Sequence, residues 1–172
     1  KINRLEIDGY EADDIIGTVS KLGEENGYKV YIVTGDKDAI QLASHKTTTL
    51  ITKKGIGEVE EYDFDSVMEK YEMTPTQFID LKGLMGDTSD NIPGIRGIGE
   101  KTAQKLLSRY ANLEELLADC ENIPEKAIKE KICTQKETAI LSKELATIIR
   151  DVDINFDIEK ELGVEIVGEK KI

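Results

Sequence analysis

The sequence has no tryptophan, one histidine, two cysteines and three prolines among its 172 residues. The single histidine, His45, has no Ser or Cys partner in any motif, so we expect a surface residue rather than part of a nucleophilic triad. Cys120 and Cys133 lack CxxC spacing and have no histidine nearby. They therefore indicate neither a zinc site nor a disulfide framework, and we interpret both as buried thiols.

Long apolar runs and an excess of basic residues are also missing. No stretch approaches the roughly 18 apolar residues of a membrane span, and no signal segment opens the chain, which favours a cytoplasmic location and no membrane partner. The formal net charge of −12 argues against a general nucleic-acid-binding protein. An acidic protein can still hold DNA through one basic element when divalent metals neutralise its acidic patch. Hydrophobic residues at 39% and charged residues at 34% indicate one globular domain or two small ones.

The most informative stretch is residues 86–103, which read GDTSDNIPGIRGIGEKTA. Asp87 and Asp90 are three residues apart, so on a helical turn they would project from one face and could share a cation. Taken alone, these two acids could also be helix caps or part of a solvated turn.

The second half of this stretch predicts a phosphate-binding turn. Gly94, Gly97 and Gly99 allow positive φ and close backbone approach, and a helix opening near Glu100 would present unpaired N–H groups to an anion. The basic residues around it are Arg96, Lys101, Lys105 and Arg109. A tight helix–helix turn without a ligand is the alternative, but it does not explain the adjacent carboxylates.

A further acidic cluster lies near the start of the chain. Glu11, Asp13 and Asp14 precede an apolar stripe, which places them in the first turn of a helix that ends near Gly27. Complementation of the helix dipole would explain them, although three acids so close together repel one another unless a cation intervenes. On this helix Glu11 and Asp14 share a face, and Asp13 points elsewhere.

Asp36 and Asp38 form the remaining cluster. They follow residues 29–34, a β-branched run that predicts a buried strand, and open parallel sheets place ligands at the carboxyl ends of strands. An EF-hand is excluded, because a loop starting at Asp36 lacks the required glycine and glutamate. Capping of a short helix over residues 39–43 is the alternative role.

The remaining pattern predicts an α/β fold. Residues 47–52 and 56–62 suggest a hairpin at the edge of a sheet, and Asp63 and Thr74 each cap a helix. Beyond residue 100 the pattern is wholly helical, and we expect its last apolar stripe in the core. That stripe consists of Leu141, Leu145, Ile148 and Ile149.

The three clusters together contain seven carboxylates at the ends of elements. Hard divalent cations such as Mg²⁺ prefer oxygen ligands, and phosphodiester hydrolysis benefits when one ion generates hydroxide while another steadies the leaving oxygen. The residues therefore suit a centre of two metal ions.

The motifs GYEADD, TGDKD and the stretch over residues 86–103, in this order, resemble those of the 5′ nuclease (flap endonuclease-like) family. More narrowly, they resemble the 5′–3′ exonuclease domain of bacterial DNA polymerase I. The resemblance implies a partial PIN-like α/β nuclease core over residues 1–85 and a helix-hairpin-helix (H3TH-like) subdomain over 86–150. From Asp151 onward the helical periodicity fades, so we expect a terminal strand or linker over 151–172. The resemblance also implies hydrolysis of DNA with two Mg²⁺ or Mn²⁺ ions.

The resemblance assigns roles by position. Glu11, Asp13 and Asp14 would bind the metal nearer the attacking water, and Asp36, Asp38, Asp87 and Asp90 would bind the second metal. The residues that hold DNA would be Gly94, Ile95, Arg96, Gly97, Ile98, Gly99, Lys101, Thr102 and Lys105, with K⁺ on backbone carbonyls. The implied partners are duplex DNA with a 5′ flap or 5′ end and the rest of a DNA polymerase I chain.

Members of this family begin with a strand that carries a further metal-binding Asp, followed by a basic helical arch. No stretch here supplies these parts, and the chain opens on Lys1, so we expect a piece of a longer protein that cleaves DNA slowly by itself. The alternative function is a non-catalytic DNA-binding module. Such a module would keep the hairpin but has no reason to keep all seven acids.

Overall fold

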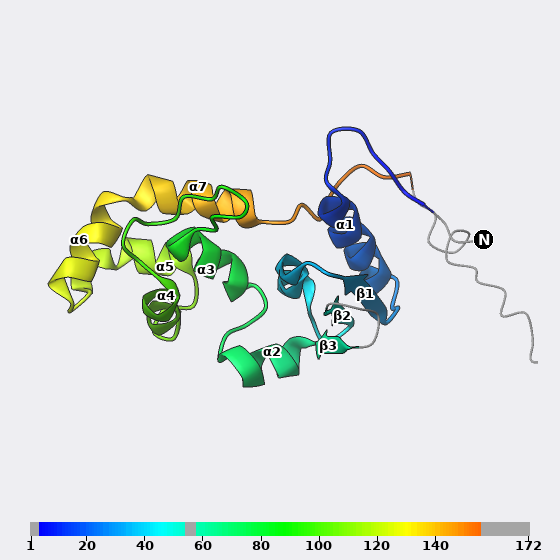
Figure 1. Ribbon diagram of the computed structural model, residues 1–172, viewed down its shortest axis with the longest axis horizontal. Coiled ribbons are helices and arrows are strands. Elements are labelled where there is room, and N and C mark those ends of the chain that lie inside the picture. The colour runs from blue at the N-terminus through cyan, green and yellow to red at the C-terminus, as the bar shows by residue number, and fades with distance from the viewer. Residues whose placement is uncertain (1–3, 54–57, 156–172) are drawn as a thin grey trace, which may run out of the picture.

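The computed structural model describes residues 4–53 and 58–155. Its elements are α1 (Ala12–Glu25), β1 (Val30–Thr34), the 3₁₀ helix η1 (Lys37–Leu42), β2 (Thr47–Thr52), β3 (Val59–Tyr62), α2 (Phe64–Tyr71), α3 (Gln77–Met85), α4 (Glu100–Leu107), α5 (Leu113–Ala118), the 3₁₀ helix η2 (Cys120–Asn122), α6 (Lys126–Thr134) and α7 (Lys136–Ala146). The sheet, α1 and η1 form one lobe, and α3 to α7 form a second, helical lobe (Figure 1). The predicted α/β class and the helical second half are confirmed.

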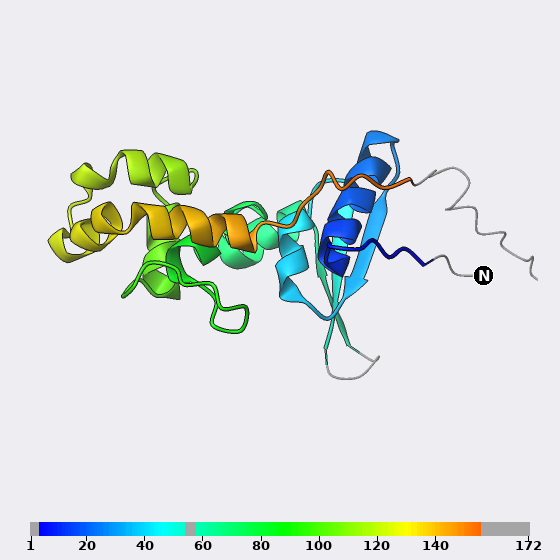
Figure 2. The ribbon, with the colours of Figure 1, turned by 90° about the horizontal axis from the view of Figure 1, so that it is seen from above.

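The sheet has the order β1-β2-β3. β1 and β2 are parallel, with Ile32 opposite Thr49, and β3 pairs antiparallel to β2, with Tyr62 opposite Thr49. Figure 2 shows α1 alongside this sheet. The hairpin predicted over residues 47–62 is confirmed for its described strands, and its tip over residues 54–57 lies outside the described residues.

β1 is not the buried strand that its apolar run predicts. Ile32 is buried, but Tyr31 and Val33 are 56% and 65% exposed. Successive side chains of a strand point to opposite faces, and the described elements cover only the face that carries Ile32. Ile16 of α1 packs on that side.

The helical lobe has its own apolar core. Its fully buried members include Leu84, Ala103, Leu113, Leu116 and Ile132. Leu84 lies on α3, and the other four lie on the helical stripes that the sequence predicts for α4, α5 and α6. The two lobes are joined by Gln41, whose amide donates to the Ala146 carbonyl oxygen at 3.0 Å and accepts from the Ile148 N–H at 2.9 Å.

α7 turns a different face to the core from the one predicted. Leu141 and Leu145 are 50% and 58% exposed, so the prediction of a buried stripe is wrong for them, and Ile149 is exposed as well. The buried residues of the helix are Ala139, Ser142 and Ala146. α7 packs closely on α3, where a Cβ added to Gly83 would lie 3.3 Å from the Ala139 carbonyl oxygen. Only small side chains fit between the two helices.

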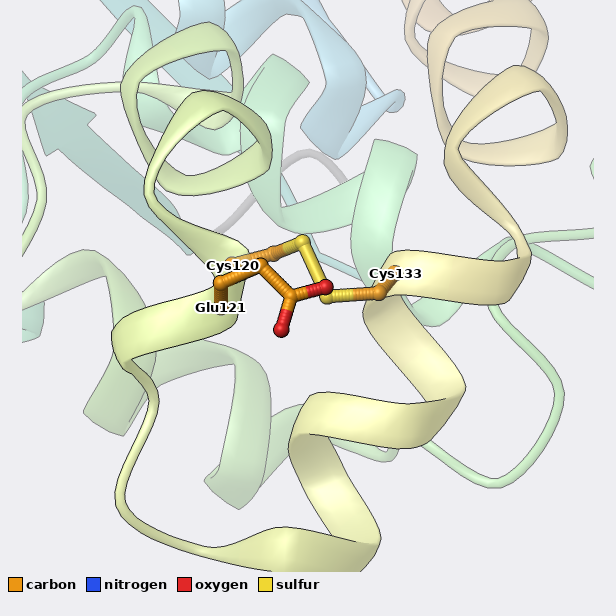
Figure 3. Close-up of side chains that lie close together, drawn as sticks. All are labelled: Cys120, Glu121 and Cys133. Atoms are coloured by element: carbon orange, nitrogen blue, oxygen red, sulfur yellow. A yellow bond between two sulfur atoms is a disulfide. The ribbon is translucent and has the colours of Figure 1, made fainter.

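Cys120 and Cys133 are joined in a disulfide between η2 and α6, so the prediction of two buried thiols is wrong (Figure 3). The turn between these helices brings the two Cα atoms to 5.7 Å, a separation typical of disulfides. Glu121 lies beside the sulfur atoms in Figure 3 and pairs with Lys129 at 2.6 Å. Since disulfide sulfurs are not thiolate ligands, this group is not a zinc site.

His45 is exposed, as expected, and its ring centroid lies 4.4 Å from that of Phe64. Residues 151–155 form no strand, and the rest of the predicted terminal strand or linker lies outside the described residues. Within the described ranges, no helix is both long and apolar enough to cross a membrane.

Candidate metal centre and nucleic-acid interface

A cleft of about 630 Å³ lies between the carboxyl end of β1 and the segment that follows α7. The carboxylates that line it belong to Glu11, Asp13, Asp14, Asp36, Asp38, Asp90 and Glu144. Asp87, the other acid predicted from the sequence, lies beside this cleft. Its carboxylate, with those of Asp38 and Asp90, offers oxygens that lie within 4.8 Å of one another. The fold thus gathers the three sequence clusters at one place.

The first cluster sits at the start of α1, where Glu11 is the residue before the helix. One carboxylate oxygen of Asp14 accepts the Glu11 N–H at 3.2 Å, and the other accepts the Ile149 N–H at 2.9 Å. Asp14 therefore ties the start of α1 to the segment after α7. Asp13 lines the same cleft as Asp36 and Asp38. Burial raises the pKa of Asp13, and the nearby carboxylates of Asp36 and Asp38 raise it further.

The second cluster begins η1, directly after β1. Asp36 accepts the Asp38 N–H at 2.8 Å, so the alternative role as a helix cap is real for this residue. Asp38 is partly buried and reaches toward the third cluster. Burial raises the pKa of Asp38, although a hydrogen bond from Lys82 opposes this effect.

The third cluster lies on a tight loop rather than on the helical turn predicted for it. Asp87 and Ile92 form a β-bridge, in which their backbone groups exchange hydrogen bonds of 2.9 and 2.8 Å. Asn91 closes the loop with a left-handed φ of 57°, and the Asp87 carboxylate accepts the Ser89 N–H at 2.9 Å. The loop, not a helical period, brings Asp87 and Asp90 to the same side.

Lys82 on α3 lies among these carboxylates and was not predicted from the sequence. Its Nζ atom pairs with Asp38 and lies 2.8 Å from Asp87 Oδ2 and 3.6 Å from Asp90 Oδ2. The hydrogen bonds from Lys82 and Ser89 lower the pKa of Asp87 to about 2. Burial opposes the charge on Lys82, but its hydrogen bonds to the carboxylates raise its pKa overall. The only sequence signal is a lysine within a mostly apolar helix.

The backbone of the glycine-rich stretch makes the close approach that the sequence predicts. Gly94 and Gly97 have φ angles of 61° and 84°, and a Cβ added to Gly94 would lie 2.1 Å from the backbone nitrogen of Gly86. Gly99 differs, since it precedes α4 with φ of −102° and an added Cβ would meet nothing within 4 Å. The prediction that Gly99 needs glycine's conformational freedom is therefore wrong.

Some N–H groups of this hairpin are used by the fold and others are not. The Gly94 N–H donates to Ser142 Oγ at 2.9 Å, and the Arg96 N–H donates to Gln135 Oε1 at 2.9 Å. Within the part of the chain that the structure describes, no acceptor faces the N–H groups of Gly97, Gly99, Glu100 and Lys101. These groups lie at the N-terminus of α4, where an anion is favoured.

The predicted basic residues fall into two sets. Arg96 and Lys101 are exposed beside these N–H groups. Lys105 and Arg109 share the carboxylate of Glu125, at 2.9 and 3.5 Å. A further lysine that the sequence did not single out, Lys131, donates to the Gly97 carbonyl oxygen at 3.0 Å.

Solved nuclease structures share this fold. T5 5′-exonuclease with bound zinc ions covers 84% of this chain and 52% of its own, with a TM-score of 0.73 and 24% identity. A complex of bacteriophage T5 D15 flap endonuclease with DNA and metal ions gives a TM-score of 0.70 at 23% identity, over 84% and 52% of the two chains. The catalytic core of Rad2 with a DNA substrate gives 0.52 at 17% identity, over 81% and 48%. These identities establish the 5′ nuclease fold and nothing finer.

The sequence shows the family. The 5′-3′ exonuclease N-terminal resolvase-like domain matches residues 1–72, and the 5′-3′ exonuclease C-terminal SAM fold matches residues 73–170. The chain belongs to the 5′–3′ exonuclease family, as the motifs predict. DNA polymerase I of Bacillus subtilis (strain 168) is 51% identical over 98% of this chain and 19% of its own length, and that of Bacillus caldotenax is 48% identical over 92% and 18%. The chain thus spans about a fifth of the length of these relatives.

Proposed function

We propose that the chain supplies the metal-binding and DNA-holding parts of a 5′–3′ exonuclease or 5′-flap endonuclease. The observation that carries the proposal is the convergence of three acidic clusters on one cleft. The same chain carries a hairpin in which the N–H groups of Gly97, Gly99, Glu100 and Lys101 meet no acceptor among the described residues. The substrate would be duplex DNA with a 5′ flap or 5′ end, cut during replication and repair. We place this activity in the bacterial cytoplasm at the nucleoid, within a longer DNA polymerase I chain.

The seven acids are the proposed ligands of two Mg²⁺ or Mn²⁺ ions. Their donors fit such ions, because carboxylate oxygens are the preferred ligands of hard cations and those of Asp38, Asp87 and Asp90 converge. When bound, the ions would polarise the phosphate and supply an activated water. Asp14 would bind an ion while its two oxygens also accept the Glu11 and Ile149 N–H groups, which fixes the orientation of its carboxylate.

The hairpin is the proposed grip on DNA. The residues assigned to it are Gly94, Ile95, Arg96, Gly97, Ile98, Gly99, Lys101, Thr102 and Lys105. Their backbone N–H groups and cations would bind phosphates and so hold duplexes of any sequence. We propose that residues 86–150 carry this role and residues 1–85 most of the metal ligands, with 151–172 as the link onward. Binding of K⁺ to the backbone carbonyls of this hairpin stays a prediction. At the Gly97 carbonyl oxygen, K⁺ would compete with the ammonium group of Lys131.

Mn²⁺ should raise the midpoint of thermal unfolding by about 5–10 °C at a concentration of about 100 times its Kd, because it binds only the folded state. The double variant Asp13→Asn, Asp38→Asn should lose most of this shift. The matched control is Asp65→Asn, which removes an exposed carboxylate in the first turn of α2 and should keep the shift. An intact Mn²⁺ shift in the double variant would show that the acids are not the ligands.

DNA affinity should fall with salt at a log–log slope of about −2 to −4, because we expect two to four phosphates to be neutralised. Lys101→Ala should reduce the slope by about one, with little dependence on DNA sequence. Lys46, exposed at the amino end of β2, offers the control variant Lys46→Ala, which should leave the slope unchanged. Fluorescence anisotropy with a labelled 5′-flap duplex, repeated at several salt concentrations, measures the slope for each protein. An unchanged slope in Lys101→Ala would remove this residue from the interface.

A further inference from the structure

We infer that Lys82 is the resident counter-cation of the acidic centre, and that a divalent ion must displace its ammonium group to bind Asp38, Asp87 and Asp90. This inference rests on the proposed function, because it concerns the same centre. It adds a residue that controls metal affinity without being a ligand.

The position of the Lys82 ammonium group overlaps that of a shared divalent ion. The carboxylate oxygens of Asp38, Asp87 and Asp90 lie within 4.8 Å of one another, and the Lys82 ammonium contacts all three residues. A divalent ion held by these oxygens would sit about 2.0–2.6 Å from each of them. That position coincides with the space the ammonium group fills, so the two cations exclude each other.

Lys82 is shielded from water by the surrounding fold. The Lys82 side chain is 16% exposed, whereas those of Lys53 and Lys105, which also pair with carboxylates, are 53% and 59% exposed. A partly buried ion pair is screened less by water and salt than an exposed one. The flanking residues Leu81 and Leu84 are buried, which fixes the part of α3 that carries Lys82.

Lys82 also lies between the two lobes. Asp38 belongs to the lobe of the sheet, and Asp87 and Asp90 belong to the loop that follows α3. Without metal, the ammonium group neutralises part of the acidic cluster and links the two lobes. With metal, the same positive charge repels the ion. Lys82 should therefore stabilise the metal-free protein and weaken metal binding.

Lys82→Gln tests both effects, since it removes the charge and keeps a hydrogen-bond donor. In the presence of a chelator, its thermal midpoint should lie below that of the wild type. Its Kd for Mn²⁺, measured by calorimetry, should be at least about tenfold lower than that of the wild type, because a like charge next to the ion is gone. Lys82→Arg keeps the charge, so its Kd should stay within about threefold of the wild-type value.

The outcomes separate this inference from the proposed function. If the wild type binds Mn²⁺ and Lys82→Gln binds it equally or more weakly, Lys82 is not a competitor and only the inference is overturned. If neither protein binds Mn²⁺, the proposed function is overturned as well. If Lys82→Gln is unfolded in chelator, its Kd is obtained from the Mn²⁺ dependence of its native circular dichroism after correction for the folding free energy that binding must also offset. A corrected Kd below that of the wild type supports the inference, and one equal or higher contradicts it.

Discussion

Gly94→Ala should lower the free energy of unfolding by about 3 kcal/mol or more. The added Cβ would lie 2.1 Å from the Gly86 nitrogen and 2.4 Å from the Met85 carbonyl carbon, and the φ of residue 94 is 61°. Backbone atoms cannot rotate away as a side chain can, so the two ends of the 86–94 loop would have to separate. Separation would also open the bridge between Asp87 and Ile92 that positions the third acidic cluster. Urea unfolding followed by circular dichroism measures the loss.

Gly99→Ala is the matched control in the same glycine-rich stretch. Residue 99 has φ of −102° and an added Cβ would have no neighbour within 4 Å, so only a weaker helix cap is expected. Its cost should be about 1 kcal/mol or less. Equal losses in the two variants would contradict the account of Gly94 as a site of close backbone approach.

Lys143→Met should cost about 3–5 kcal/mol of stability, because it leaves the carboxylate of Asp80 buried without its counter-charge. The Asp80 side chain is 5% exposed, with Oδ1 at 2.7 Å from Lys143 Nζ and 3.1 Å from the Leu113 nitrogen. Burial raises the pKa of Asp80, and the hydrogen bond from Lys143 offsets part of that increase. This group joins α3, α5 and α7, so its loss should loosen the whole helical lobe.

The comparison is Lys129→Met, which breaks the pair of Lys129 with Glu121, a side chain that is 73% exposed. Exposed pairs contribute about 0–1 kcal/mol, so this variant should unfold nearly as the wild type does. Combining Lys143→Met with Asp80→Leu should recover much of the stability, since no buried charge remains. If Lys143→Met costs no more than Lys129→Met, the buried pair does not stabilise the lobe.

Local features of the acidic clusters could be predicted because their causes are local. Glu11 precedes a helix, Asp36 follows a strand and caps η1, and Glu100 opens α4, each as the sequence pattern indicates. Caps and strand ends depend on a few neighbouring residues. The resemblance to the 5′ nuclease family then correctly identified the family of the chain.

Features that depend on tertiary packing could not be predicted. Lys82 enters the centre because α3 ends beside η1, which no sequence spacing reveals. Leu141 and Leu145 recur at helical spacing, as core residues do, yet both are exposed. The close approach of α7 to Gly83 decides which face of α7 is buried, because only small side chains fit there. The disulfide of Cys120 and Cys133 likewise depends on the turn between η2 and α6.

The central claim is that three clusters, far apart in the sequence, form one metal centre. Paramagnetic broadening of backbone amide signals by substoichiometric Mn²⁺ tests this most directly, because broadening reports proximity to the bound ion. The signals of Asp13, Asp38 and Asp90 should broaden together over one range of Mn²⁺ concentration, while that of Asp65 on α2 stays sharp. Broadening of one cluster while the other two remain sharp would contradict a shared centre.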